Sequence, residues 1–418
     1  MKKLHRNILC IDLKSFFASV ECIERKLDPF TTPLVVANKR QGNGAITLAV
    51  SPYLKTFGVP GRTRLYQIPK DIKYIIAPPR MKLYINKSKE VINIYLSFIS
   101  KEDLHIYSID ECFLDVTDYL HYYKMTDVEL AKKILDTIKE RTGLTATCGI
   151  GPNMVLAKIA MDIESKHTKD NLAKWDYDDI PSKLWPISPL SKVWGIGPRL
   201  EKKLNLIGIN KIEDLAKSDC FYLKNKFGIL GEELWCRANG IDNSIIREFK
   251  ESPQKSFGHS QILMKDYYND SVLLIIKEMM EVLTERLRYN NLETNNVAFS
   301  IGYSKSVGGG FHHQLKLNNS TDNTMELYNY CKDMFEKYYE ENMPIRRVAI
   351  SLGALSPKRG IQLNLFNNLD NQIKEDKIKH AIDEIKVRFG KNSILNTTSL
   401  LPNSTAKERN QKIGGHHE

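Results

Sequence analysis

The chain has 418 residues, of which 42% are hydrophobic and 27% charged, so we expect a globular protein with several domains. No apolar run is long enough to cross a membrane, and the run that follows the basic N-terminus stops at Asp12, too early for a signal peptide. The net charge of +11 falls within residues 1–90, which hold 17 Lys and Arg against 6 Asp and Glu. This basic third predicts a polyanionic partner, such as a nucleic acid or a nucleotide, although a basic surface that serves solubility alone would have the same composition.

The seven cysteines form no Cys-x-x-Cys pair. Several of them lie in apolar runs, as small buried hydrophobic residues do. This usage is typical of a reduced compartment, and we expect a cytoplasmic protein.

The N-terminal third alternates between apolar segments and a basic insertion. Residues 8–11 form a predicted buried strand that ends at Asp12, a helix is expected to begin near Ser15, and residues 34–37 form a second strand. Residues 38–80 are rich in Gly, Pro and cations, which indicates a small, basic, mobile insertion. An apolar-periodic helix is expected over residues 81–100.

Two adjacent acids, Asp110 and Glu111, separate two short predicted strands at residues 104–107 and 113–116. Neighbouring residues of a regular strand face opposite ways, so these acids can serve one site only at a strand end or a hairpin turn. The pattern favours that position. A solvated turn with two surface acids is the alternative for this motif taken alone.

The next segments continue the alternation of helices and strands. A helix is predicted at 127–141, a strand at 145–150, and a helix at 152–165 that Pro152 opens. A proline-rich break at 181–189 marks a domain boundary. A helix, a hairpin containing Gly195, Ile196 and Gly197, and a second helix follow. Such a hairpin presents backbone N–H groups at a helix N-terminus and can bind phosphate without reading sequence.

A third module has the order βαββαβ, which is two copies of one half-unit. Its predicted strands and helices are 255–264, 271–289, 296–304, 310–317, 324–340 and 345–355. After Pro357 the chain becomes polar, with one amphipathic segment at 369–390 of undecided role, and we expect disorder from about residue 392. One apolar peptide interrupts this tail, and its anchors are Gln362, Leu363, Leu365 and Phe366.

Three acids at the ends of neighbouring strands, Asp12, Asp110 and Glu111, predict a metal site. Crowded carboxylates repel one another unless a divalent cation neutralises them, and hard oxygen ligands select Mg²⁺ or Mn²⁺. Two such ions would stabilise the attacking and leaving oxygens of an in-line phosphoryl transfer. The cations that a triphosphate needs are available nearby in Lys55, Arg62, Arg64, Lys158 and Lys166.

Residues 11–21 (IDLKSFFASVE) together with residues 108–111 (SIDE) resemble the paired signature of Y-family (translesion) DNA polymerases. The resemblance covers residues 5–357, and residues 49–55 (AVSPYLK) resemble the UmuC/UvrX-like branch of Gram-positive bacteria. It implies an α+β multidomain fold shaped as a right hand. The implied domains are a palm (1–37 and 81–175), small fingers (38–80), a helix-hairpin-helix thumb (176–240), a βαββαβ little finger (241–357) and a flexible C-terminal tail (358–418).

The resemblance also implies roles for single residues at the metal site. Asp12, Asp110 and Glu111 match the catalytic acids that hold two Mg²⁺ ions, for which Mn²⁺ can substitute. Leu13 matches the position whose backbone carbonyl completes a metal shell, so its side chain should matter little.

Further matches concern the incoming nucleotide. Phe17 corresponds to the steric gate that leaves no room for a ribose 2′-hydroxyl, with an ordinary core residue as the alternative, and Phe16 would pack near the nucleotide. Lys55 replaces an arginine that contacts the triphosphate in many relatives, and Pro52 replaces a tyrosine there. Lys166 lies one residue out of register with the family's second triphosphate lysine.

The peptide at residues 362–366 resembles the segment by which bacterial polymerases bind the replicative sliding clamp. The alternative is a short strand that packs on its own module. The implied partners are primer-template DNA, dNTPs and the clamp, with an accessory subunit left open and no membrane. The implied role is low-fidelity translesion synthesis during DNA repair and the SOS response, at the nucleoid.

Two other functions remain open at this point. Another two-metal palm enzyme, such as a nucleotide cyclase, would form product without a primer-template and has no use for a thumb hairpin. A non-catalytic DNA-binding scaffold derived from a polymerase would bind DNA without incorporation. Such a scaffold would be expected to have lost a catalytic acid, and all three are present.

Overall fold

The computed structural model describes residues 3–249, 256–358 and 369–417. The chain divides into two compact units, one formed by residues 1–250 with 416–418 and the other by residues 251–415. Among the described helices, none combines the length and the apolar character that crossing a membrane requires.

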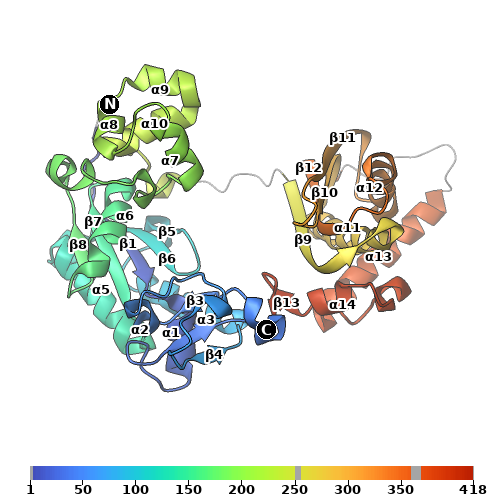
Figure 1. The fold of residues 1–418 in the computed structure, drawn as a ribbon, viewed down its shortest axis with the longest axis horizontal. Coiled ribbons are helices and arrows are strands. Elements are labelled where there is room, and N and C mark those ends of the chain that lie inside the picture. Colours follow the sequence, from blue (N-terminus) through green and yellow to red (C-terminus); the bar gives the residue numbers. More distant parts are fainter. Residues whose placement is uncertain (1–2, 250–255, 359–368, 418) are drawn as a thin grey trace. The chain divides into compact units, whose positions relative to one another are not determined.

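A five-stranded sheet with the order β5-β6-β1-β7-β8 forms the centre of the first unit (Figure 1). The middle strand β1 pairs antiparallel with β6 on one side and β7 on the other. Because side chains alternate along a strand, Leu9 and Ile11 enter the large core on one face, whereas Ile8 and Cys10 enter a smaller cluster on the other. The strands are β1 (Ile8–Leu13), β5 (Leu104–Ile106), β6 (Glu111–Asp115), β7 (Ala146–Gly151) and β8 (Leu172–Lys174).

Helices cover both faces of this sheet. The large core contains side chains of α1 (Phe16–Glu24), α3 (Met81–Leu96) and α5 (Asp127–Thr142). The smaller cluster contains side chains of α6 (Met154–Ile163). The boundaries of α5 follow from its sequence, because Thr126 and Glu129 form a capping box and Gly143 ends the helix with a φ of +72°. A short helix α4 (Tyr119–Tyr123) precedes α5.

Two glycines of β7 allow α6 to approach the sheet closely. A Cβ atom at Gly149 would lie 2.1 Å from the carbonyl oxygen of Ala157, and one at Gly151 would lie 2.5 Å from the Ala157 nitrogen. No side chain larger than hydrogen fits at either position. The glycines therefore set the height of α6 above the sheet, and with it the height of the residues that α6 carries toward β1 and β6.

The basic insertion forms a small subdomain with its own core. Its sheet has the order β3-β2-β4, in which β2 (Leu34–Val36) pairs antiparallel with β3 (Ala49–Val50) and parallel with β4 (Ile75–Ala77). The helix α2 (Pro52–Thr56) begins with Ser51 as its cap. Because β2 belongs to this sheet, the subdomain uses residues before the expected boundary at 38.

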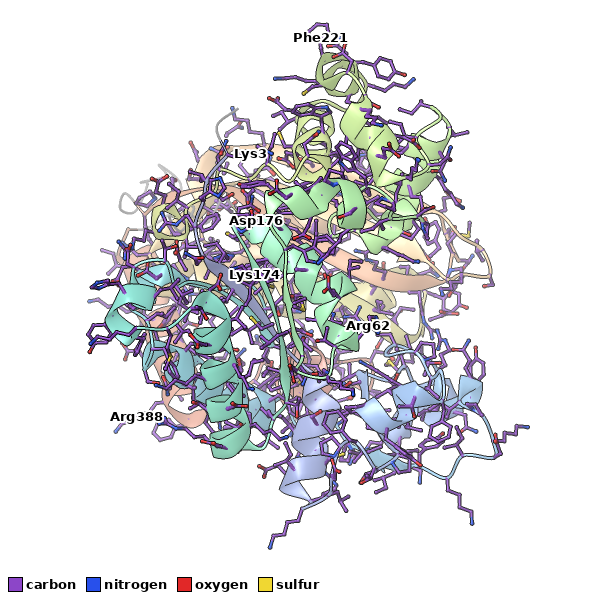
Figure 2. The ribbon with its side chains drawn as sticks, turned by 90° about the vertical axis from the view of Figure 1, so that its left-hand side faces the viewer. Lys3, Arg62, Lys174, Asp176, Phe221 and Arg388 are labelled. Atoms are coloured by element: carbon purple, nitrogen blue, oxygen red, sulfur yellow. The ribbon has the colours of Figure 1, made fainter. Side chains whose placement is uncertain are left out.

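Four short helices follow the palm sheet, namely α7 (Pro198–Asn205), α8 (Ile212–Lys217), α9 (Cys220–Phe227) and α10 (Ile229–Ala238). The predicted Gly-x-Gly hairpin lies directly before α7, and Gly197 is the residue that caps this helix. Figure 2 shows Phe221 at the outer tip of these helices, where its side chain is 70% exposed.

The second unit confirms the βαββαβ order. Its antiparallel sheet has the strand order β11-β10-β12-β9, and α11 and α12 pack on one face of it (Figure 1). The predicted boundaries are right to within a few residues. The elements are β9 (Ser256–Tyr267), α11 (Leu273–Tyr289), β10 (Leu292–Tyr303), β11 (Gly310–Thr321), α12 (Thr324–Tyr338) and β12 (Ile345–Pro357).

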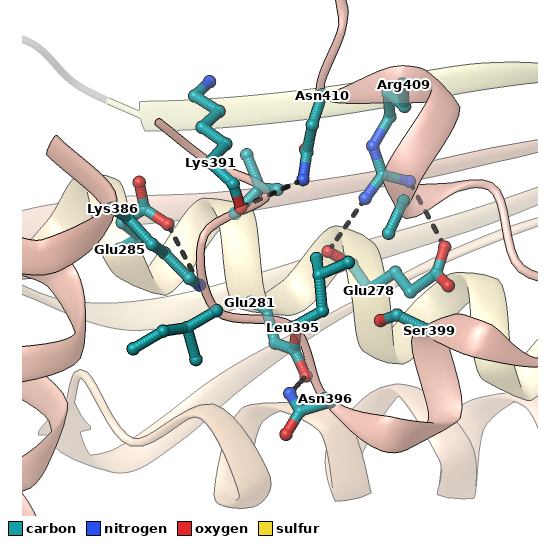
Figure 3. A pocket seen from close by; sticks show the side chains of 13 residues that line it. Glu278, Glu281, Glu285, Lys386, Lys391, Leu395, Asn396, Ser399, Arg409 and Asn410 are labelled. Atoms are coloured by element: carbon teal, nitrogen blue, oxygen red, sulfur yellow. Dashed lines mark hydrogen bonds and ion pairs between the residues drawn. The ribbon is translucent and has the colours of Figure 1, made fainter. Parts of the chain in front are cut away.

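The expectation of a flexible, disordered C-terminal tail is wrong for residues 369–417. This segment forms α13 (Leu369–Phe389), α14 (Ala406–Arg409) and the short strands β13 (Lys412–Ile413) and β14 (His416–His417). Polar contacts hold it on α11, where Glu278 accepts hydrogen bonds from Ser404 Oγ at 2.5 Å and Thr405 N at 3.1 Å. Figure 3 shows further contacts between the tail and α11, from Arg409 to Glu278 and from Lys386 to Glu285. Arg288 and Asp383 form a two-bond ion pair at 2.6 and 3.1 Å. The tail can dock although it is polar, because α11 supplies charged partners for it.

Candidate active site

The register of β1 and β6 brings the predicted acids to one end of the sheet. Asp12 lies directly opposite Glu111, so both side chains are on the same face, the face that α6 covers. Asp110 is the last residue of the turn before β6, and its carbonyl oxygen accepts the N–H of Leu13 at 3.0 Å. The expectation that the adjacent acids lie at a hairpin turn is therefore confirmed in geometry.

The carboxyl group of Asp12 is in an unfavourable place for a negative charge. Burial and the nearby Asp110 and Glu111 raise its pKa from 3.8 to about 7, even though the ammonium group of Lys166 acts in the opposite direction. The Lys166 Nζ atom lies 4.0 Å from Asp12 Oδ2. A site with these properties favours the binding of an additional cation.

Glu111 already has a cationic partner. The Nζ atom of Lys158, on α6, lies 2.8 Å from Glu111 Oε1, and both side chains are more than nine-tenths buried. Burial disfavours the charged ammonium, but the hydrogen bond to Glu111 overcomes this and raises the pKa of Lys158 above its ordinary value. The thiol of Cys10 donates a second, weaker bond to Glu111 at 3.3 Å.

The three acids are not arranged as the ligands of one metal ion. Asp110 Oδ1 accepts a hydrogen bond from Ser108 Oγ at 2.7 Å, while lysines approach Asp12 and Glu111. Within the described residues, no three His, Cys, Asp or Glu side chains converge closely enough to enclose an ion. A divalent cation would therefore have to exchange these protein contacts for its own.

Phe17 is half-buried, and its ring lies on the ring of Tyr84 with the centroids 4.6 Å apart and the planes at 23°. The Tyr84 hydroxyl donates to Glu21 Oε1 at 2.7 Å. Glu21 is fully buried and also accepts two bonds from Arg80, at 3.0 and 2.8 Å. These contacts fix the ring that lies behind Phe17, and the sequence analysis did not identify Tyr84 or Arg80.

Phe16, which is predicted to pack near the nucleotide, points into the core. Its side chain is only 3% exposed and belongs to the large core, with Tyr84 as one neighbour. Neighbouring side chains of a helix point about 100° apart, so at the start of α1 Phe16 faces the core while Phe17 is half-exposed. The role of Phe16 beside the nucleotide stays a prediction.

Besides Lys158, two more of the predicted triphosphate cations, Lys55 and Lys166, lie close to the acids. Burial and the positive charge of Lys166 lower the pKa of Lys55, while Asp12 opposes that change. Lys14, which the sequence analysis did not select, has a lowered pKa because of burial and the charges of Lys166 and Lys55. Its Nζ atom donates a hydrogen bond to Asn171. Three lysines from separate elements therefore gather beside Asp12.

The thumb hairpin differs in part from its prediction. Gly195 has a φ of +88°, and a Cβ there would lie 1.9 Å from Arg237 Nη1. Ile196 has a buried side chain, and its N–H donates to the Val193 carbonyl at 3.1 Å, so this amide is already used. Only the amides around Gly197 and the start of α7 lie at the helix N-terminus.

The hairpin also touches the acidic turn. Trp194 Nε1 donates a hydrogen bond to the Tyr107 hydroxyl at 3.2 Å, and Tyr107 immediately precedes Ser108 of that turn. No sequence pattern indicates such a contact between distant segments. The predicted clamp-binding residues Gln362, Leu363, Leu365 and Phe366 lie outside the described residues.

The chain matches the model of the impB/mucB/samB family over residues 11–162 and the C-terminal domain of that family over residues 254–365. Residues 177–209 match the IMS family HHH motif, which confirms the helix-hairpin-helix prediction.

Similar proteins cover nearly the whole chain. The sequence is 40% identical to UvrX of Bacillus subtilis over 414 residues, covering 98% of this chain and 97% of that protein. It is 33% identical to DNA polymerase IV 2 of the same species, covering 98% of both chains. A DNA polymerase IV of Pelotomaculum thermopropionicum is 31% identical and covers 96% of this chain and 97% of its own length.

The fold also has a counterpart among solved structures. A Y-family DNA polymerase chimera built from Dbh and Dpo4 superposes with a TM-score of 0.66 at 20% identity, covering 84% of this chain and 99% of that one. At this identity the likeness concerns the fold alone. It confirms the predicted α+β right-hand architecture.

Proposed function

The chain belongs to the impB/mucB/samB family of Y-family DNA polymerases, and from this we propose that it is a translesion polymerase that extends a primer on damaged template DNA. In this reaction the primer 3′-oxygen bonds to the α-phosphorus of a dNTP, and pyrophosphate leaves. The fold and the family establish a DNA-directed DNA polymerase. The site residues, the metal chemistry and the fidelity are our proposals.

The observation that carries the proposal is the cross-strand pairing of Asp12 with Glu111, beside Asp110 in the adjoining turn. Mutual repulsion and burial make Asp12 a poor place for an uncompensated charge, as its raised pKa indicates. Carboxylate oxygens are the donors that Mg²⁺ and Mn²⁺ prefer. These three residues, with the Leu13 carbonyl, would therefore hold two divalent ions, which when bound would activate the 3′-hydroxyl and neutralise the triphosphate.

The nucleotide would lie between Phe17 and the lysine cluster. The Phe17 ring, backed by Tyr84, would close the space that a ribose 2′-hydroxyl needs. Lys55 and Lys166 would contact the triphosphate, supported by their proximity to Asp12. Lysine supplies charge without the two-pronged geometry of arginine, so these contacts would orient the phosphates less strictly.

The open face of the little-finger sheet supports contact with DNA. The register assigns to this face mostly Gly, Ser and Ala positions, such as Gly258, Ser300 and Ala349. Among these short side chains stand the exposed cations Arg347 and Lys316. A smooth sheet face with sparse cations suits a phosphate backbone and does not discriminate between bases. Binding should then weaken as salt rises.

Low fidelity, clamp binding through residues 362–366 and a role in the SOS response belong to the same proposal. The support for the clamp contact is the sequence of the peptide itself, with a glutamine and two large apolar anchors.

The direct test is extension of a labelled primer on undamaged and abasic templates, with Mg²⁺ and each dNTP. Wild type should extend both, and Glu111→Ala should lose extension by at least about 10²-fold, because transition-state charge is no longer stabilised. Glu140→Ala, at an exposed position on α5, is the matched control and should behave as wild type.

The two alternatives give different results in the same assay. A nucleotide cyclase-like enzyme would consume nucleotide without a primer-template. A scaffold would bind DNA tightly and show no incorporation even with added clamp. Either result with the wild-type protein would overturn the proposal.

A further inference from the structure

The acids of the active site and the lysines of α6 form one alternating chain of charges. Starting at Glu111, the contacts run to Lys158 at 2.8 Å, from Lys158 to Asp162 at 3.1 Å, and from Asp162 to Lys166 at 2.8 Å. Lys166 then approaches Asp12 at 4.0 Å, and Asp12 lies opposite Glu111 in the sheet. The chain therefore closes on itself around the site.

The helix explains why these side chains meet. Lys158 and Asp162 are four residues apart on α6, which places them on the same face. Lys166 is four residues further on, in a short 3₁₀ turn formed by Ser165–His167. The spacing of four continues past the end of the helix, so Asp162 reaches both lysines with its two oxygens, Oδ2 to Lys158 and Oδ1 to Lys166.

We propose that Asp162 is a positioning residue that holds Lys158 against Glu111 and Lys166 at the mouth of the acidic site, where the nucleotide triphosphate binds. The inference rests on the proposed function, because it assigns Lys166 to the triphosphate. The proposal also explains how Lys166 can contribute although it lies one residue out of register with the family's lysine. The contact with Asp162 directs the Lys166 side chain toward Asp12.

The burial of its partner Lys158 distinguishes Asp162 from an ordinary surface acid between two lysines, since the Asp162 side chain itself is 25% exposed and that of Glu213 is 28% exposed. Glu213 on α8 also contacts two lysines, but Lys211 and Lys217 are 47% and 62% exposed. In contrast, Lys158 is only 8% exposed and has Glu111 and Asp162 as its anionic partners. Removing the Asp162 charge would leave Lys158 with Glu111 as its remaining anionic partner. It would also free the long Lys166 side chain to sample many rotamers.

Asp162 would also keep Lys166 in place once a cation binds. A divalent ion on Asp12 would repel the ammonium group 4.0 Å away, whereas the shorter contact with Asp162, at 2.8 Å, would remain. Lys166 would then turn from Asp12 toward the phosphates without leaving the site. Binding of the triphosphate would thus use an ammonium group that is already oriented.

The test measures dNTP binding without turnover, on a complex of the full chain with a dideoxy-terminated primer-template. Asp162→Asn should raise the dNTP dissociation constant about tenfold, the low end for losing an oriented charge-assisted contact. Lys166→Ala should raise it by a similar factor. The double variant should be no weaker than Lys166→Ala alone, because Asp162 acts through Lys166.

Controls separate this outcome from general damage. Asp162→Glu keeps the charge and should recover most of the affinity, Glu213→Gln should bind dNTP as wild type does, and primer-template affinity should be unchanged in all variants. The proposal is overturned if Asp162→Asn binds dNTP within twofold of wild type, or if its effect adds fully to that of Lys166→Ala. Wild type that extends no primer would instead contradict the proposed function.

Discussion

Asp12, a proposed metal ligand, has a cost in stability. Its pKa is raised from 3.8 to about 7 in the folded, metal-free protein. Between these two values the folded state holds a proton that the unfolded state has lost, so the free energy of unfolding falls as pH rises through this window. The cost is fully present above pH 7 and absent below about pH 4.

Asp12→Asn removes this titration and should stabilise the metal-free protein at pH 8, by at most about 4 kcal/mol at 1.36 kcal/mol per pKa unit. Below about pH 4 the two proteins should unfold at the same temperature. Thermal unfolding across pH with a chelator present checks this. A stabilisation that does not change with pH would show that burial of the Asp12 charge is not its cause.

Tyr84 determines how firmly the proposed gate is held. Tyr84→Leu removes the ring that stacks on Phe17, so the Phe17 ring gains freedom to move away from a 2′-hydroxyl. The preference for dNTP over rNTP, measured as a ratio of kcat/KM values, should fall about tenfold, equivalent to about 1.4 kcal/mol.

Tyr84→Phe is the matched variant. It keeps the ring and removes only the hydroxyl that donates to Glu21. Its nucleotide preference should stay within about threefold of wild type. Equal losses in both variants would assign the effect to the Glu21 network and not to stacking.

At the level of single residues, the sequence indicated the acids and Phe17 because each lies in a dense local motif. It could not indicate Lys158 as the partner of Glu111, or Tyr84 as the partner of Phe17, because these contacts join segments 47 and 67 positions apart. The motif also does not tell which of the neighbouring rings Phe16 and Phe17 faces the core. The packing of the helix α1 on the sheet decides that.

The helix α6 carries Lys158 and Asp162, and its packing on β7 holds these two residues of the charge chain in place. Gly149→Ala would set a Cβ 2.1 Å from the Ala157 carbonyl oxygen and 2.3 Å from the Met161 nitrogen, both backbone atoms of α6. The helix must move away, so we expect a loss of about 3 kcal/mol in the free energy of unfolding, measured with denaturant. Gly44→Ala, where only a distal Arg64 atom lies within 4 Å, should cost far less. Equal costs would contradict the close approach.

The C-terminal helix α13 is held to α11 by a largely buried ion pair. Asp383→Asn leaves the charge of Arg288 in a poorly solvated place, so unfolding of the second unit should become easier by about 2 kcal/mol. Glu384→Gln, at the exposed neighbouring position, is the control. Thermal unfolding together with limited proteolysis of the tail would measure the effect. No difference between the two variants would show that this ion pair does not anchor α13.

The elements themselves were largely predictable. The βαββαβ unit and the palm strands have strong periodicity, and their observed bounds agree with the expected ones to within a few residues. The tail was not predictable, because its docking uses polar pairs such as Glu278 with Ser404 instead of an apolar stripe. A segment that is polar by composition was therefore assigned to disorder.

Over the whole molecule, the first unit contains the sheet that bears the proposed catalytic acids, and the second unit contains a sheet whose open face is smooth and sparsely cationic. The excess positive charge falls within residues 1–90, whereas the other residues have balanced charge. Electrostatic attraction to DNA should therefore come from the first unit, and the second unit would contribute shape and a few phosphate contacts. The composition predicts this division of charge between the units. It does not predict which face of each sheet is open.

The most direct test of the account measures DNA binding and nucleotide incorporation side by side for wild type and Asp12→Asn. The account predicts that both proteins bind primer-template with similar affinity, and that single-turnover incorporation with Mg²⁺ falls by at least about 10²-fold in the variant. Incorporation by Asp12→Asn at the wild-type rate would contradict the role of the acidic site.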